Sequence, residues 1–320
     1  MKAAIHTHYG PPEVVQIREV DKPTPGPRDL LIRVYASTVN RTDCGFRSAE
    51  YVISRLFSGL LRPKQQTLGC EFAGQVEAVG TDVTLFRPGD RVFGFNDSQF
   101  GGHAEYMTLP EDAAVTTIPA GLAYDEAAPI AEGAHYALCN IRASGITRGQ
   151  KALVYGATGA IGSAAVQLLR QAGVVVTAVC ASPHVGLVRS LGADRVIDYT
   201  REDFTKTGEV FQVVFDAVGK SSFGQCKPIL SETGNYISTE LGKNGENVFR
   251  ALLAPLQRGK KVLFPLPTTT RDDIVFLRDL VSQGAFRPVI DRRYPLSQIV
   301  DAYRYVETGQ KIGNVVITLA

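Results

Sequence analysis

The sequence predicts an α/β fold with two domains, one rich in short strands and one built on a doubly wound parallel sheet. Turn residues break residues 1–123 into short strand-like runs, whereas short apolar runs alternate with helix-like segments from residue 124 onwards. Apolar strands that alternate with helices are typical of a parallel sheet covered on both faces. The length of 320 residues also suits two domains of ordinary size.

The first domain is predicted to resemble a β-barrel. Strand-like runs at 3–15 and 29–40 flank the turn-rich segment 21–29, and residues 69–80 alternate like a pair of strands. One helical segment is expected at 49–61, where apolar residues recur at helical spacing.

The second domain is predicted to alternate strands and helices. Helices are expected at 124–144, 160–173 and 184–193; strands are expected at 151–156, 174–180, 195–198, 212–218, 234–239 and 260–266. A tail at 288–320 contains a further helix and a closing strand, which we expect to return to the first domain. The predicted domains are therefore 1–123 with 285–320, and 124–284.

Composition excludes several classes of function. The formal net charge of +2 is too small to indicate a nucleic acid or an anionic membrane as the main partner. No apolar run reaches the ~18 residues of a membrane span. The five cysteines are widely spaced, with no C-x-x-C pair, which is typical of reduced thiols and predicts a cytoplasmic protein.

The strongest motif is LVYGATGAIGSAAV at 153–166, between a predicted buried strand and a predicted helix. Its glycines are spaced G-x-x-G-x-x-G. Such a turn lets a dinucleotide pyrophosphate approach the backbone and the N–H groups at the helix start. A glycine-rich turn without a ligand is the simpler interpretation, but the surrounding alternation of strands and helices argues against it. The predicted phosphate-binding residues are Gly156, Ala157, Thr158, Gly159, Ala160, Ile161 and Gly162.

The end of the second strand indicates NADPH rather than NADH. NAD sites usually place an acidic residue there to hold the ribose hydroxyls. Here the strand ends at Cys180 without one, and Ser182 and His184 are expected to contact a 2′-phosphate. No Asp or Glu lies between Glu132 and Asp194, and the basic residues of that stretch are His135, Arg142, Arg148, Lys151, Arg170, His184 and Arg189. The simpler interpretation is that most of these arginines face water.

These pieces together resemble the medium-chain dehydrogenase/reductase superfamily. The resemblance rests on GCEFAGQVEAVG, RPGDRVFG, GGHAEY and the late GATGAIG, and it covers nearly the whole chain. It is closest to the zinc-free quinone oxidoreductase (zeta-crystallin-like) branch, which implies a GroES-like catalytic domain, a Rossmann domain and a homodimer.

The resemblance also implies that no zinc is bound. Zinc alcohol dehydrogenases of this superfamily carry a Cys where Asn40 stands and a His where Cys70 stands, and they have a third ligand near Glu132. A catalytic zinc normally needs three protein ligands, so Cys70 alone is not a site and Glu132 with Cys70 makes an unusual pair. Cys70 is instead expected to line the cleft or to pack in the core.

Without zinc, reduction of an electron-poor quinone or α,β-unsaturated carbonyl is the expected reaction. By resemblance, Asn40 and Arg41 contact the acceptor and Asp43 positions them, although capping of a turn explains Asn40 and Asp43 equally well. Tyr51 is the nearest tyrosine that could supply a proton, and water is the alternative donor. An apolar acceptor pocket is expected from Phe46, Phe95 and Phe100. Further cofactor contacts implied by the resemblance are Tyr199, Ala217, Val218, Gly219 and Phe264.

Other functions remain open at this point. The runner-up enzyme is a zinc-independent alcohol or aldehyde dehydrogenase. A different class is a non-catalytic NADPH-binding sensor or structural protein, because a fold does not determine a function. A short-chain dehydrogenase is rejected, since the glycine spacing differs and no Tyr is followed four residues later by Lys.

Overall fold

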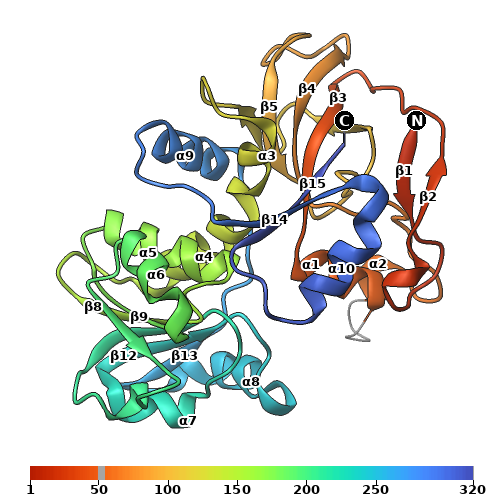
Figure 1. Cartoon of the computed structure of the whole chain (residues 1–320). Helices are drawn as coiled ribbons and strands as arrows, with labels where there is room; N and C mark the ends of the chain where they lie inside the picture. Colours follow the sequence, from red (N-terminus) through yellow and green to blue (C-terminus); the bar gives the residue numbers. More distant parts are fainter. Residues whose placement is uncertain (50–54, 320) are drawn as a thin grey trace. The chain divides into compact units, whose positions relative to one another are not determined.

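The chain forms two compact units in a computed structural model that describes residues 1–49 and 55–319 (Figure 1). The first unit comprises Met1–Glu132, Thr269–Gly284 and Pro288–Ala320, and the second comprises Gly133–Thr268 and Ala285–Arg287. The tail returns to the first unit, as expected.

The boundaries of the two units differ from the predicted domain boundaries, because residues 124–132 and 269–284 belong to the first unit and residues 285–287 to the second. The ring of Tyr124 stacks on Tyr35 with centroids 4.6 Å apart. Arg278 Nη1 donates to Thr116 Oγ1 at 3.2 Å. Contacts between segments far apart in the sequence therefore decide both assignments, and local periodicity does not report them.

The first unit is built on a seven-stranded sheet and a separate antiparallel pair, β1 (Lys2–Ile5) with β2 (Gln16–Glu19). All neighbours in the seven-stranded sheet are antiparallel except β14 and β15. Its strand order is β14 (Ile290–Pro295), β15 (Asn314–Thr318), β3 (Asp29–Val39), β4 (Glu71–Val79), β5 (Arg91–Phe95) and β7 (Val115–Thr117), with β6 (Tyr106–Pro110) paired to β3.

Two local predictions for the first unit differ from the structure, and one helix was not predicted. The pair of strands expected at 69–80 is the single strand β4, because β3 pairs along its length from Leu30↔Val79 to Ser37↔Phe72. The helix expected at 49–61 is described only as α2 (Arg55–Ser58), and residues 50–54 lie outside the described residues. An additional helix, α1 (Arg41–Ser48), precedes it.

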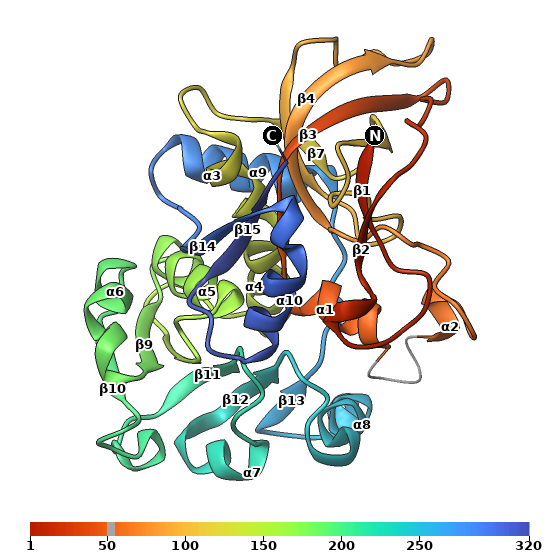
Figure 2. The ribbon, with the colours of Figure 1, turned by 45° about the vertical axis from the view of Figure 1, so that its right-hand side comes forward.

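The second unit is a six-stranded sheet in which every neighbouring pair is parallel (Figure 2). The strand order is β10 (Arg195–Asp198), β9 (Val175–Cys180), β8 (Lys151–Tyr155), β11 (Phe211–Asp216), β12 (Leu230–Ser238) and β13 (Lys261–Leu263). The order reverses between β8 and β11, which makes the carboxyl end of β8 the topological switch point of a doubly wound fold. This confirms the predicted fold class.

Helices flank this sheet, and apolar side chains such as Leu153, Val214 and Ile197 are fully buried beneath them. Figure 1 shows α5 and α6 near β8 and β9, and α7 and α8 near β12 and β13. The helices of this unit are α4 (Ala131–Ser144), whose first two residues belong to the first unit, α5 (Ala160–Gln171), α6 (Val185–Ser190), α7 (Phe223–Cys226) and α8 (Glu246–Leu253).

The helix predicted at 124–144 is interrupted. It consists of α3 (Tyr124–Ala127), a 3-10 turn at Ala128–Ile130 and α4, because Pro129 adopts a non-helical ψ of 15° and has no N–H to continue the ladder. The remaining helices of the first unit are α9 (Arg271–Ser282) and α10 (Ile299–Glu307). In the part of the chain that the structure describes, the other 3-10 helices are Pro12–Val14, Ser182–His184, Phe204–Lys206, Lys227–Ile229, Lys243–Gly245, Ala254–Leu256 and Leu296–Gln298.

Candidate functional site

The glycine-rich turn connects β8 to α5 at the switch point. Gly156 has a φ of +80°, and a Cβ there would lie 2.5 Å from Val218. A Cβ on Gly162 would lie 2.1 Å from the carbonyl oxygen of Gly156, so the helix can approach the strand only with glycine here. By contrast, a Cβ on Gly159 would have only the Gly156 oxygen nearby, at 3.8 Å. The turn therefore has tight positions on either side of an open one, which suits close approach of a ligand at Gly159.

The other residues of the turn either hold it against β9 or lie at the start of α5. Ala157 is buried and its N–H donates to Val179 O at 3.2 Å, which holds the turn against β9. Gly159 caps α5, and Thr158, Ala160 and Ile161 are half-buried at its first turn. The first N–H groups of a helix lack partners within it, and the helix dipole adds positive charge there. These residues thus fit the pyrophosphate of a dinucleotide.

A second turn packs directly on the first. It follows β11 and contains Ala217, Val218 and Gly219, of which Gly219 has a φ of +64°. The side chain that organises it is Asp216, which is fully buried and accepts bonds from Val218 N at 3.1 Å and Ser221 N at 2.7 Å. Sequence reasoning named the turn and missed Asp216, although an acid that ends an apolar strand and precedes a glycine turn is a usable signal.

A carboxylate from the neighbouring strand β10 lies at the end of the second strand, β9. Ser182 donates to the carboxylate of Asp198, which lies opposite Cys180 in the β9–β10 register. Hydrogen bonds from Ser182 and Thr200 hold the pKa of Asp198 below its usual range, so the group is ionised at neutral pH. Arg201 lies 3.5 Å from this carboxylate. The expectation of an acid-free strand end is therefore wrong, because it considered one strand and the acid comes from its neighbour.

The remaining residues predicted to bind the cofactor lie at different depths of the second unit. Tyr199 is 53% exposed and its ring faces Tyr155, with centroids 6.3 Å apart. Cys180 is buried, and burial raises the pKa of its thiol to about 11. His135 is buried in α4 against Tyr136. His184 lies in the 3-10 turn after β9, and Phe264 directly follows β13.

In the first unit, the Asp43 side chain caps α1, and Asn40 is the N-cap residue of this helix. Asp43 Oδ2 accepts from Asn40 N, and its Oδ1 accepts from Gly69 N, both at 2.9 Å. Asn40 Nδ2 donates to Glu71 Oε2 at 2.9 Å and to Thr38 Oγ1 at 3.1 Å. Both side chains are buried, so capping accounts for Asp43, as the alternative interpretation held. Asn40 Oδ1 is buried without a partner among the described residues.

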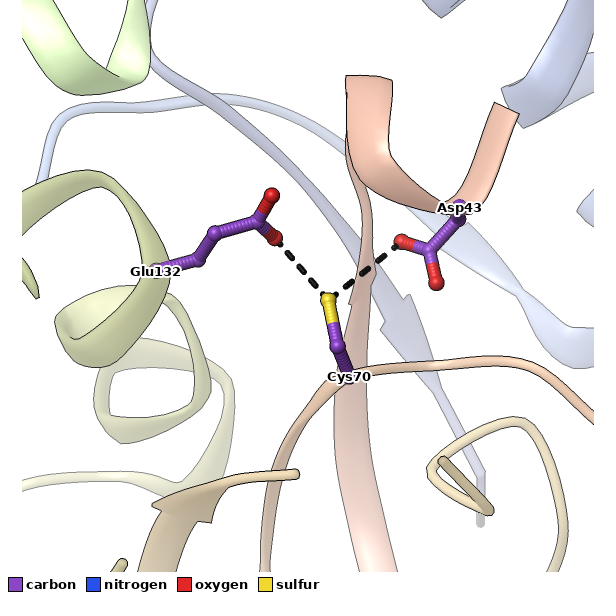
Figure 3. A group of neighbouring side chains, drawn as sticks. All are labelled: Asp43, Cys70 and Glu132. Carbon is purple, nitrogen blue, oxygen red and sulfur yellow. Dashed lines mark hydrogen bonds between the residues drawn. The ribbon is translucent and has the colours of Figure 1, made fainter. Parts of the chain in front are cut away.

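These residues belong to a buried cluster that also contains Cys70, Glu132 and Glu71. Figure 3 shows Asp43, Cys70 and Glu132 of this cluster. The Cys70 thiol donates to Glu132 Oε2 at 3.1 Å and points towards Asp43 Oδ2 at 3.9 Å. One ligand-type atom from each of Asp43, Cys70 and Glu132 lies within 4.8 Å of the others. The sequence indicated Glu132 near Cys70, and the structure adds Asp43, because α1 and α4 each bring a carboxyl group to the thiol.

The other oxygens of the cluster are also engaged. Thr42 Oγ1 donates to Glu132 Oε1 at 2.6 Å. Glu71 Oε1 accepts from Glu132 N at 2.6 Å, and Glu71 Oε2 also accepts from Thr38 Oγ1 at 2.7 Å. Glu71 and Thr42 were not predicted. The signal for Glu71 is its place as the first residue of β4, among the apolar residues of a strand that is buried from Glu71 to Gly74.

Burial raises the pKa of all three acids of the cluster, so each keeps its proton to a higher pH than usual. Desolvation, followed by the charge of Glu132, raises the pKa of Glu71 to about 8. Desolvation and then the charge of Asp43 raise the pKa of Glu132 to about 7, and desolvation raises that of Asp43 to about 6. Burial and the same carboxylates raise the pKa of the Cys70 thiol well above its usual value. The cluster therefore holds bound protons at neutral pH.

Hydrogen bonds within the protein already engage the ligand-type atoms of this cluster. Zinc takes a thiolate and needs lone pairs from three ligands. Here the thiol is protonated and is itself a hydrogen-bond donor to Glu132, and both oxygens of Asp43 accept backbone N–H groups. A zinc ion bound here would therefore have to displace the thiol proton and the hydrogen bond from Cys70 to Glu132.

The structure describes four of the five remaining candidates for the acceptor site. Arg41 is the first residue of α1 and is exposed. Phe46 and Phe100 form an edge-to-face pair with centroids 4.9 Å apart, whereas Phe95 is buried in β5. Tyr51 lies outside the described residues.

Comparison with known proteins gives consistent matches over the whole chain. Residues 26–120 match the alcohol dehydrogenase GroES-like domain, and residues 191–317 match the zinc-binding dehydrogenase family. A 2-methylene-furan-3-one reductase of Solanum lycopersicum is 30% identical over 99% of this chain and 79% of its own length. A chloroplastic quinone-oxidoreductase homolog of Spinacia oleracea is 31% identical over 93% of this chain and 92% of its own.

A solved structure agrees with these sequence matches. The quinone oxidoreductase from Coxiella burnetii superposes with a TM-score of 0.88 at 27% identity, over 100% of this chain and 99% of that one. The chain therefore belongs to the medium-chain dehydrogenase/reductase superfamily of oxidoreductases, with quinone oxidoreductases among its homologues. This confirms the resemblance seen in the sequence.

Proposed function

We propose that this protein is a zinc-independent, NADPH-dependent reductase of quinones or α,β-unsaturated carbonyls. The observation that carries the proposal is the turn from Gly156 to Gly162, where two tight positions flank the open Gly159 at the switch point of the sheet. The names of the two relatives and of the solved structure support an electron-poor acceptor.

The bound cofactor supplies a hydride, that is, a hydrogen with its electron pair. An enone takes the hydride at its β-carbon and a proton at its α-carbon, and a quinone takes both to become a hydroquinone. The chain must bind the cofactor and the acceptor together, stabilise the negative charge that develops on the acceptor oxygen, and let one proton reach the acceptor. We assign Asn40 and Arg41 to the acceptor and Asp43 to positioning of the α1 N-terminus. Water is the alternative proton source to Tyr51.

The preference for the phosphorylated cofactor is also a proposal. Ser182, His184 and the exposed guanidinium of Arg201 support a 2′-phosphate, and Arg201 offsets the charge of Asp198 at 3.5 Å. Asp198 nevertheless repels a phosphate, so we expect NADPH to be preferred over NADH by a modest factor.

We further propose that the protein is a cytoplasmic homodimer. Its five cysteines are free thiols, as expected in a reducing compartment. β13 ends the parallel sheet, and the neighbouring segment exposes Phe249, Leu252 and Leu256 by 66%, 74% and 84%. A sheet edge beside apolar side chains suits pairing with a second copy. Light scattering of the purified chain tests this assignment.

No helix among the described residues is long and apolar enough to span a membrane.

Initial rates test the function directly. NADPH and NADH oxidation is measured with one quinone, one enone and one aldehyde, before and after dialysis against a chelator. The proposal expects quinone or enone turnover with NADPH that survives chelation. Turnover of an alcohol or aldehyde alone would favour the alternative dehydrogenase. Tight NADPH binding without turnover of any acceptor would favour a sensor or structural protein.

A further inference from the structure

A basic hollow lies in the second unit, at the end of the parallel strands opposite to the glycine-rich turn. Its volume is about 350 Å³, within the range of small-molecule sites. The turn follows the carboxyl end of β8, whereas the hollow is formed where β12 and β13 begin. Because these strands are parallel, the two features lie at opposite ends of them. The lining residues are Phe223, Lys227, Arg250, Gln257, Arg258, Lys260 and Val262.

Four of the lining side chains are cationic and none is acidic. Arg250 lies 3.5 Å from Glu246, one turn earlier on α8. Among the described residues, Lys227, Arg258 and Lys260 form no ion pair. The hollow therefore collects more positive charge than the surrounding chain neutralises, and a ligand of opposite charge would be attracted to it.

The hollow has a fixed floor. Phe223 and Val262 are buried at 7% and 1% exposure, and the Arg250 guanidinium lies over the Phe223 ring at 5.4 Å. Lys260 Nζ donates to Lys227 O at 2.7 Å, which ties the turn before β13 to the turn before β12. This bond holds part of the basic group in place before any ligand arrives, and preorganisation lowers the entropic cost of binding.

We propose that this hollow binds a small molecule with two or more linked phosphate groups. Planar guanidinium groups and ammonium groups are the side chains that recognise phosphate oxygens. Three unpaired cations match the charge of a diphosphate better than that of a single phosphate. The phosphates can be inorganic or belong to a nucleotide. The site is independent of the proposed reductase function, since none of its residues belongs to the glycine-rich turn or the acidic cluster.

Calorimetric titration of the full chain tests the proposal, with NADPH added first to saturate the glycine-rich turn. Inorganic pyrophosphate is the probe, and orthophosphate, ADP and citrate are compared at the same ionic strength. We expect pyrophosphate to bind at least about tenfold more tightly than orthophosphate and citrate, since linked phosphates reach several cations at once. Tighter binding of ADP than of pyrophosphate would identify a nucleotide as the source of the phosphates. Weaker binding of ADP than of pyrophosphate would identify an inorganic diphosphate as the ligand.

Matched variants locate the site. Lys227→Gln and Arg258→Gln are each expected to weaken pyrophosphate binding by about tenfold, since each removes one charged contact. Lys243→Gln makes the same charge change at an exposed position of this unit outside the hollow, and it is expected to leave binding unchanged. NADPH affinity reports that all three variants are folded. Equal weakening by Lys243→Gln, citrate binding as tight as pyrophosphate, or no pyrophosphate binding would each overturn the proposal.

Discussion

Gly162 in the first turn of α5 faces the carbonyl oxygen of Gly156, and only 2.1 Å separates that oxygen from where a Cβ on Gly162 would lie. The first turn of α5 can therefore approach β8 only because position 162 has no side chain. This contact sets the shape of the turn that we assign to the pyrophosphate.

Gly162→Ala is expected to weaken NADPH binding by at least about tenfold and to lower the free energy of unfolding by about 1–3 kcal/mol, as overpacking does. Gly224→Ala is the control, since its nearest neighbour would be Ser222 Oγ at 3.9 Å and it is also helical. Fluorescence titration with NADPH and urea unfolding measure the two effects. Equal NADPH affinity in the two variants would contradict the assignment of the turn.

Asp198→Asn is expected to raise the preference for NADPH over NADH by roughly tenfold, because it removes a negative charge beside Ser182; at a few ångströms such a charge is worth about 1–2 kcal/mol. The ratio of kcat/KM for the two cofactors is the measurement. Asp203→Asn, a partly exposed acid that caps its own turn, serves as the control. A ratio that falls or stays constant in Asp198→Asn would place the adenosine ribose elsewhere.

Cys70→Ser is expected to preserve turnover within about threefold, because a hydroxyl can replace the thiol as a donor to Glu132. Elemental analysis of the purified wild-type chain is expected to show far less than one zinc per chain. Stoichiometric zinc that is lost in Cys70→Ser together with activity would show that the cluster is a metal centre.

The cluster also predicts how stability depends on pH. The folded pKa values of Glu71 and Glu132, about 8 and about 7, lie above the ordinary value of 4.5 that applies in the unfolded chain. Between these values the folded state binds more protons than the unfolded state. The stabilisation that these two groups add to the free energy of unfolding is thus fully present below about pH 4.5 and is lost as the pH rises through about 8.

Urea unfolding at several pH values between about 5 and 9 measures this contribution against Glu132→Gln, since other acids of the chain titrate as well. Thr42 and Cys70 can each donate to or accept from an amide, so this variant keeps the shape of the cluster. We expect the free energy of unfolding to fall less steeply with pH in Glu132→Gln than in the wild type. Parallel curves would show that Glu132 is ionised throughout.

The alternation of apolar strands and helices was sufficient to predict the parallel sheet, because buried strands and amphipathic helices leave periodic signals. The glycine-rich turn could also be found, since only glycine fits Gly156 and Gly162. The contact of Asp198 with Ser182 could not be predicted, because it depends on the pairing of β9 with β10. Periodicity in the sequence does not show which strands are neighbours.

The acidic cluster was beyond sequence reasoning for the same reason. Asp43 lies in α1, Cys70 directly precedes β4 and Glu132 lies in α4. Only the folded first unit brings their ligand atoms within 4.8 Å of one another. The extents of the two units were also missed, since the contact of Arg278 with Thr116 joins residues that are far apart in the chain.

Transfer of deuterium from C4-labelled NADPH is the most direct test of the central claim. The enzyme is incubated with one enone, using each of the two C4-labelled forms of NADPH, and the product is examined by mass spectrometry and NMR after chelator treatment. The account predicts one deuterium at the β-carbon of the saturated product from one of the two forms. NADPH that binds without yielding labelled product, or transfer that requires added zinc, would contradict the account.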